Sequence, residues 1–235
     1  MTSLKILSGG AAQGLVASLA PKFTELTGLT IEGEFGAVGA MAGKLRGGWP
    51  ADIVVLTAAL IADLARENLV ASASISDIGR VETAIAVRSG DPLVSVHDAA
   101  SLREVLLGAD AIFVPDTRVS TAGIHVAKVL QQLGIADDVA DRLRIYPNGA
   151  TAMRHLAETD ALRPVGCTQS TEIINTRGVR LSGSLPGGCD LSTVYTAAIA
   201  TGAAHSPQAR TLIDLLTDAN RRELRTQAGF LDARN

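Results

Sequence analysis

Strand-like and helix-like patterns alternate over about the first 70 residues. Apolar residues recur at helical spacing over residues 15–26, and apolar and polar residues alternate over residues 29–35 as they do in a half-buried strand. The continuous apolar run at residues 53–56 is typical of a strand covered on both faces, as in a parallel sheet. This order predicts an α/β lobe, whose ligands lie beyond the carboxyl ends of the strands.

The alternation continues to the end of the chain. Further strands are expected at residues 83–87, 111–114, 143–146, 164–167, 179–181 and 194–200, and helices at residues 40–46, 58–67, 101–107, 124–133, 207–216 and 221–228. Ser101 and Glu104 have the spacing of a capping box, which predicts Ser101 as an N-cap. Crossings near residues 88–92 and at strand 194–200 divide the chain into two lobes, residues 1–83 with 195–235 and residues 84–194.

The first strand runs into a turn of small residues, which are Ser8, Gly9, Gly10, Ala11 and Ala12. A helix that starts at Ala11 or Ala12 leaves its first backbone N–H groups unpaired, and their partial positive charge favours a carboxylate or an oxyanion. The two glycines let a ligand approach the main chain closely. The turn therefore predicts an anion site, with an ordinary strand-to-helix turn as the alternative.

Similar small-residue turns follow later strands, at residues 35–39 and 120–123. The hydroxyls of Ser120 and Thr121 either cap the next helix or face a ligand. Arg118 is able to pair with a carboxylate, with a solvated loop arginine as the alternative, and the donor and acceptor of Gln169 suit an acid. The candidate binding residues beyond the first turn are Ala37, Val38, Gly39, Arg118, Ser120, Thr121, Ala122, Asn148 and Gln169.

Composition argues against nucleic acid as a partner. The net charge is -3 and no basic cluster extends beyond Arg221-Arg222, so the electropositive footprint of a nucleic-acid-binding protein is missing. Aromatic residues make up only 3% of the chain, too few for base-stacking platforms. A chain of 235 residues that is 47% hydrophobic can form one large α/β domain or two lobes with separate cores.

Histidine and cysteine spacing predicts no metal site and no cofactor. The four histidines lack paired ligand spacing, and Cys167 and Cys189 match no zinc pattern. Both cysteines are expected as buried thiols, and the sequence leaves their pairing open.

The start of the sequence shows no signal peptide, and no membrane-spanning segment is recognised. Met1 is followed within a few residues by the first strand rather than by a basic region and a long apolar run. The chain as written is therefore expected in the cytoplasm. If a leader was removed before Met1, the protein is periplasmic instead.

Four stretches resemble the type II periplasmic solute-binding proteins, and specifically the molybdate-binding-protein family. They are residues 6–12, residues 35–39 with 48–53, residues 114–116 with 121–124, and residues 227–230. The resemblance implies an α/β fold of two lobes, each a mostly parallel sheet flanked by helices, which two crossover strands join and which close like a hinge on a ligand in the cleft between them. It also implies an ABC transporter permease as partner if the protein is exported.

Members of that family hold a tetrahedral oxyanion with backbone N–H groups, serines in the first two turns and a tyrosine in the second lobe. This chain has Gly10 or Ala11 and residues 37–39 where the serines are expected, and Gln169 where the tyrosine is expected. Fewer donors weaken oxyanion binding, because each charge-assisted hydrogen bond contributes roughly 1.5–3 kcal/mol. We therefore expect a small anion such as a di- or tricarboxylate rather than molybdate.

Aconitate isomerase is similar to the same family, which gives a second hypothesis, a cytoplasmic isomerase that shifts a proton along an unsaturated polycarboxylic acid. Backbone donors would stabilise the dienolate, and a base would return the proton. The candidates for this base are Cys167, His125, Tyr195 and Glu172, although His125 is expected first of all to pack on its helix. A cytoplasmic ligand sensor is a third hypothesis. Binding is favoured narrowly, because the site is marked by donors rather than by catalytic side chains.

Overall fold

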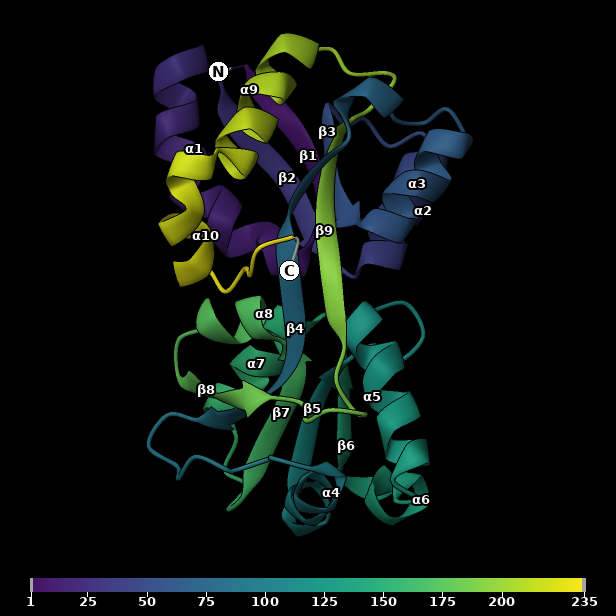
Figure 1. Ribbon diagram of the computed structural model, residues 1–235, viewed down its shortest axis with the longest axis vertical. Coiled ribbons are helices and arrows are strands. Elements are labelled where there is room, and N and C mark those ends of the chain that lie inside the picture. Colours follow the sequence, from purple (N-terminus) through teal and green to yellow (C-terminus); the bar gives the residue numbers. More distant parts are fainter. Residues whose placement is uncertain (1, 234–235) are drawn as a thin grey trace. The chain divides into compact units, whose positions relative to one another are not determined.

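The computed structural model describes residues 2–233 and divides the chain into two compact units (Figure 1). The first unit combines Met1–Val81 with Thr193–Asn235, and the second is Glu82–Ser192. The boundaries expected from the sequence were 83/84 and 194/195, and those in the structure are 81/82 and 192/193. The hydrophobic clusters of each unit contain residues of that unit alone, and each unit is described by itself below.

The sheet of the first unit is built on three parallel strands. β1 (Ser3–Gly9) pairs in parallel with β2 (Thr30–Gly36) and with β3 (Ile53–Thr57), and β9 (Ser192–Ile199) runs antiparallel to β3. All five residues of β3 are buried, as the continuous apolar run predicted. Because β1, β2 and β3 run the same way, their carboxyl ends lie at one edge of the sheet, where Tyr195 of β9 pairs with Thr57.

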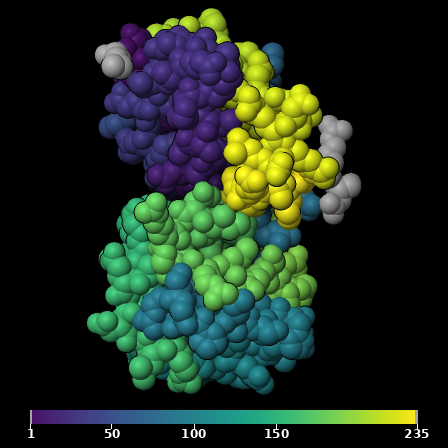
Figure 2. Space-filling model, turned by 90° about the vertical axis from the view of Figure 1, so that its left-hand side faces the viewer, coloured from purple at the N-terminus to yellow at the C-terminus, as the bar shows by residue number. Residues whose placement is uncertain are grey.

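Helices cover both faces of this sheet. α1 (Gln13–Thr27), α9 (Ser206–Thr217) and α10 (Arg222–Gln227) lie on one face, and α2 (Val38–Arg46) and α3 (Ala58–Arg66) lie on the other (Figure 1). Short 3₁₀ turns occupy Gly10–Ala12, Ser72–Ser74 and Ala219–Arg221. Figure 2 shows the yellow C-terminal segment against the purple N-terminal segment of the same unit. Phe23 and Phe230 are among its largest fully buried side chains.

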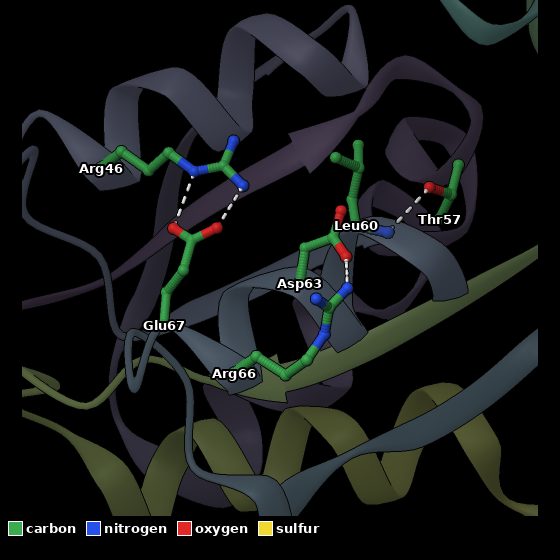
Figure 3. A network of polar contacts seen from close by, with 6 residues as sticks. All are labelled: Arg46, Thr57, Leu60, Asp63, Arg66 and Glu67. Atoms are coloured by element: carbon green, nitrogen blue, oxygen red, sulfur yellow. Dashed lines mark hydrogen bonds and ion pairs between the residues drawn. The ribbon is translucent and has the colours of Figure 1, made fainter.

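One ion pair joins the end of α2 to the end of α3, and a second lies within α3 (Figure 3). The guanidinium of Arg46 donates from Nε and Nη2 to the two carboxylate oxygens of Glu67, at 2.8 and 2.7 Å, and Arg66 pairs with Asp63. The hydrogen bond from Arg46 holds the pKa of the Glu67 carboxyl below its usual value. These pairs are exposed, and exposed pairs contribute little stability.

The sheet of the second unit also has three parallel strands. β5 (Ala111–Pro115) pairs in parallel with β6 (Leu143–Tyr146) and with β7 (Pro164–Gln169). β4 (Ser76–Arg88) runs antiparallel to β7 and to β8 (Val179–Ser184). The carboxyl ends of β5, β6 and β7 therefore share one edge, and the segments that follow Pro115, Tyr146 and Gln169 leave from it.

Two separate cores lie on the two faces of this second sheet. α4 (Ala99–Gly108), α5 (Thr121–Gln132) and α6 (Ala136–Val139) cover one face, with a 3₁₀ turn at Ala140–Arg142. α7 (Gly149–Glu158) and α8 (Ser170–Ile174) cover the other face, where Met153 and Leu156 of α7 are fully buried. No helix within residues 2–233 is both long and apolar enough to cross a membrane.

The predicted start of α4 was wrong by three residues. The N-cap is Asp98, whose carboxylate accepts a 2.7 Å hydrogen bond from the Ser101 backbone N–H, while the Ser101 hydroxyl accepts from the Asp98 N–H at 3.1 Å. Ser101 is therefore the third residue of the helix (N3) in a capping box and not the N-cap. Asp98 is an equally strong cap, and it begins the helix one turn earlier.

Candidate functional site

The first small-residue turn begins at the buried end of β1. Gly10–Ala12 form a 3₁₀ turn, and the α-helix starts at Gln13 rather than at Ala11 or Ala12 as predicted. The Ser8 hydroxyl is fully buried and donates a 2.9 Å hydrogen bond to the Gly9 carbonyl, so its proton is used within the turn. Within the described residues no side chain caps this 3₁₀ turn or α1, and both Ala11 and Ala12 are buried.

The second small-residue turn lies against the first. Ala37 is the N-cap of α2 and has no side chain that can bond to the helix, so the helix opens at Val38 and Gly39 without a side-chain cap. A Cβ placed on Gly9 would lie 2.7 Å from Val38 Cγ1 and 2.9 Å from Tyr195 Cε1. Glycine at position 9 therefore serves the close packing of these two turns and of Tyr195, whatever ligand the turns bind.

The third turn begins α5 in the second unit. Ser120 is the N-cap, 9% exposed, but its hydroxyl makes no capping hydrogen bond, so side-chain capping, one of the two roles predicted for it, is absent. Thr121 is half-buried and Ala122 is buried at the start of the helix. Arg118 is exposed, and its backbone N–H donates to the Asp116 carboxylate at 2.7 Å.

A steric feature explains the Ala-Gly pair at the start of α5. A Cβ on Gly123 would lie 2.2 Å from the Asp116 carbonyl oxygen and 2.5 Å from that of Pro115. Only glycine allows the first turn of α5 to approach the end of β5 this closely. The sequence motif thus fixes the position of a helix N-terminus at the carboxyl edge of the sheet.

The start of α7 differs from the other turns, because the protein fills it with its own groups. The Asn148 side chain accepts a 2.8 Å hydrogen bond from the Thr151 N–H. The carboxyl of Glu172 accepts a 2.6 Å hydrogen bond from the Thr168 hydroxyl and further ones from the backbone N–H groups of Gly149, Ala150 and Gln169. This helix end therefore has an internal acceptor, and Asn148 serves as a cap.

Burial is the main influence on the Glu172 carboxyl. It is 7% exposed, and desolvation raises its pKa above the usual value, with the Thr168 and backbone hydrogen bonds acting in the opposite direction. A Cβ on Gly149 would lie 1.9 Å from Glu172 Oε2, so a glycine is required where the carboxyl sits. This arrangement was not expected from the sequence. The four-residue spacing of Thr168 and Glu172 and the Asn-Gly pair at 148–149 are the sequence features that could have indicated it.

Gln169 ends β7 at the same edge of the second sheet as the segment that precedes α5. Its side chain is 3% exposed, and neither Nε2 nor Oε1 has a hydrogen-bond partner within residues 2–233. Thr83, which stands opposite Gln169 on β4, and Thr171 also have buried hydroxyl oxygens without a partner there. A group of unsatisfied polar atoms in a buried position requires an explanation.

The other three candidates for proton transfer are held by structural contacts. Cys167 is buried, and desolvation raises the pKa of its thiol to about 12, so it is protonated at neutral pH and is a weak nucleophile. His125 Nε2 lies 2.8 Å from the Cys189 carbonyl oxygen, and the Tyr195 ring packs edge-on against Phe230 at 6.3 Å between centroids. Cys167 and Cys189 are both buried free thiols.

Side-chain capping separates two classes of helix start in this chain. α3, α4 and α7 have N-caps whose side chains bond to the helix, namely Thr57, Asp98 and Asn148. The turns at Gly9, Ala37 and Ser120, which the sequence predicted to bind an anion, lack such a bond among the described residues. The starts of α6, α8, α9 and α10 lack one as well. Within residues 2–233 no group of three or more His, Cys, Asp or Glu residues is placed to hold a metal ion.

Nearly the whole chain matches a known protein family. A model of the family described as bacterial extracellular solute-binding protein matches residues 4–231. The chain belongs to this family. The predicted resemblance to the type II periplasmic solute-binding proteins is confirmed, and so is the predicted α/β class with sheets flanked by helices.

Individual relatives of this solute-binding protein are distant in sequence. The periplasmic molybdate-binding protein of Azotobacter vinelandii aligns with a TM-score of 0.82 at 18% identity, over 97% of this chain and 99% of its own. The sulfate-binding protein SubI of Mycobacterium tuberculosis aligns with a TM-score of 0.76 at 19% identity, over 100% of this chain and 88% of its own. An aconitate isomerase from Pseudomonas sp is 24% identical over 225 residues, 92% of this chain and 82% of its own.

The family description also bears on location. It refers to extracellular proteins, which agrees with the exported alternative and gives no support to the expectation of a cytoplasmic protein.

Proposed function

We propose that this protein binds a small anion, a carboxylate or an oxyanion, through backbone N–H groups at the starts of its helices. The observation that carries the proposal is the absence of side-chain caps at Gly9, Ala37 and Ser120, which lie at or after the ends of the parallel strands β1, β2 and β5, whereas the helices after β3 and β6 are capped. Uncapped N–H groups at a helix start attract negative charge. Membership of the solute-binding family supports the same function.

A carboxylate suits these turns better than molybdate. Hydroxyl donors are missing from Gly10–Ala12 and from 37–39, and the Ser8 proton is donated to the Gly9 carbonyl. A compact dianion would therefore lose donors that each contribute roughly 1.5–3 kcal/mol. Separate carboxylate groups need only one helix start each.

Thermal unfolding with a panel of anions tests the proposal. The panel holds molybdate, sulfate, citrate, cis-aconitate and trans-aconitate. A ligand at about 100 times its Kd adds roughly 2.7 kcal/mol of stability, and at about 2–4 °C per kcal/mol this raises Tm by roughly 5–11 °C. We expect the carboxylates to produce this shift. If every anion in the panel leaves Tm at the value of the protein without added anion, anion binding by these helix starts is contradicted.

A charge placed at the helix start serves as the matched variant. In Ser120→Asp the new carboxylate caps α5 itself and repels an anion, so the ligand-induced shift should disappear while the free protein melts no lower than before. Ala37→Asp repeats the test at the start of α2 in the first unit, where the new carboxylate should likewise remove the ligand-induced shift. His205→Asp adds the same charge at α9, outside the predicted turns, and should keep the full shift.

A second candidate function is isomerisation of an unsaturated polycarboxylic acid, and the similarity to aconitate isomerase over 92% of this chain favours it. A base would remove a proton from the carbon next to the double bond, the double bond would shift, and the proton would return to the far carbon. Incubation with cis-aconitate, followed by chromatographic detection of trans-aconitate, tests this function. Binding without interconversion would leave the protein a receptor.

The corresponding partner of an exported receptor is the permease of an ABC transporter. The extracellular description of the family supports this proposal. We propose no nucleic-acid partner, since the net charge of -3 means that the chain has no excess of basic residues to contact phosphates.

A further inference from the structure

Gln169 carries a buried side-chain amide at the carboxyl edge of the second sheet. Its side chain is 3% exposed, and among residues 2–233 neither its NH₂ group nor its carbonyl oxygen has a hydrogen-bond partner. Buried amides in folded proteins are almost always bonded, because the unpaired groups lose their water without compensation. Both the NH₂ group and the carbonyl oxygen are unpaired, so a partner of this side chain must offer a hydrogen-bond donor as well as an acceptor.

The strand register places this amide on the face of the sheet that α5 covers. Gln169 and Cys167 lie two residues apart on β7, so their side chains point to the same face. Cys167 and its cross-strand neighbour Ile85 pack in one core with Val126 and Val129 of α5. Gln169 is therefore on the α5 side, at the carboxyl edge of the sheet.

Thr83 belongs to the same face and the same edge. It stands directly opposite Gln169 in the antiparallel β4–β7 pair, and its hydroxyl oxygen is also buried without a partner among the described residues. Cross-strand neighbours in such a pair have adjacent side chains. Two orphaned polar groups thus lie side by side on the face covered by α5, whose N-terminus has no side-chain cap.

On the opposite face of the same strand end, the Thr168 hydroxyl has a partner within the chain. Thr168 points away from α5, and its hydroxyl donates to Glu172, which also accepts from Gly149 and Ala150 at the start of α7. The chain therefore supplies an acid to the start of α7, whereas no described group is within hydrogen-bond distance of the Gln169 amide or the Thr83 hydroxyl. This contrast indicates that the α5 side is left for an external ligand.

We propose that Gln169 and Thr83 select a small carboxylate that also carries a hydroxyl group. The proposal rests on the proposed function and names its ligand class. The carboxylate oxygens accept from the amide NH₂ and from the N–H groups at the start of α5, and the ligand hydroxyl donates to Gln169 Oε1. A fully deprotonated oxyanion such as sulfate or molybdate offers acceptors only, and leaves that oxygen buried and unpaired.

Matched pairs of ligands test this selection by isothermal titration calorimetry. Citrate is compared with tricarballylate, which has the same three carboxylates without the hydroxyl, and malate is compared with succinate. We expect each hydroxylated acid to bind roughly 10–100-fold more tightly than its partner, because the deoxy acid leaves a buried acceptor unpaired. Sulfate should bind more weakly than either hydroxy acid.

Gln169→Met identifies the residue responsible. Methionine replaces the amide by an apolar side chain of similar length, so the variant should fold, bind the hydroxylated and deoxy acids about equally, and lose most of the preference. Gln132→Met is the control on α5, where the amide already donates to the Gly188 carbonyl at 2.9 Å, and it should keep the preference.

The possible failures are distinguishable. If none of the four acids binds and sulfate does not bind either, both the proposed function and this inference are wrong. If both members of each pair bind the wild-type protein equally well, anion binding stands and the selection for a hydroxyl is overturned. A preference that survives in Gln169→Met would overturn the assignment to Gln169.

Discussion

Gly123→Ala is expected to destabilise the protein strongly. The new Cβ would lie 2.2 Å from the Asp116 carbonyl oxygen and 2.5 Å from the Pro115 carbonyl oxygen, and neither backbone group can swing aside. Overpacking costs about 1–3 kcal/mol and occasionally more, so a loss of about 3 kcal/mol in the free energy of unfolding is reasonable. At about 2–4 °C per kcal/mol, Tm should fall by roughly 6–12 °C.

Gly43→Ala is the matched control for this substitution. Gly43 lies inside α2, and a Cβ there meets nothing within 4 Å. Alanine should therefore stabilise the helix by about 0.5–1 kcal/mol. Thermal unfolding of both variants by circular dichroism makes the comparison, and equal melting temperatures would show that α5 can move away from β5 at little cost. In that case Gly123 would not fix the position of the helix start.

The second large effect concerns the pH dependence of stability caused by Glu172. Burial raises the pKa of this carboxyl above its unfolded value, so the folded state holds the proton more tightly than the unfolded state does. The stability that protonated Glu172 contributes is therefore complete below the unfolded pKa of about 4.3 and is lost as pH rises toward the folded pKa. The loss reaches at most about 1.4 kcal/mol per pH unit.

Glu172→Gln removes this titration and so measures it. Urea unfolding at several pH values from about 4.5 to 8 should show the wild-type protein losing stability relative to the variant as pH rises. Glu67→Gln is the control, because Arg46 lowers the pKa of Glu67, so the contribution of Glu67 is lost only as pH falls below the unfolded pKa of about 4.3 and should stay constant over this range. A constant difference between wild type and Glu172→Gln would mean that the hydrogen bonds to the carboxylate offset its burial.

Local pattern was sufficient for most of the fold. The continuous apolar run of β3 and the capping side chain before α7 each reflect interactions among residues close in sequence. The N-cap of α4 was wrong because Asp98 and Ser101 are both good caps, and the choice between them depends on where the chain enters the helix. β4 extends over Ser76–Arg88 instead of 83–87, because its ladder is completed by partners from distant parts of the chain.

The candidate site was predictable only in part. The small-residue turns and the end of β7 follow from the sequence, since strand ends and glycines are local features. Which helix starts stay uncapped was not predictable. Ser120 has a suitable hydroxyl and does not cap, whereas the start of α7 is filled by Glu172 from beyond β7.

The sequence by itself determined the α/β class, the order of the elements and the family, because periodicity and short motifs depend on neighbours along the chain. Only the tertiary structure decided which polar groups satisfy one another. It paired Glu172 with the start of α7 and left Gln169 and Thr83 without partners among the described residues. Hydrogen bonds depend on distances and directions between residues far apart in sequence, and those are set when the strands pair and the helices pack.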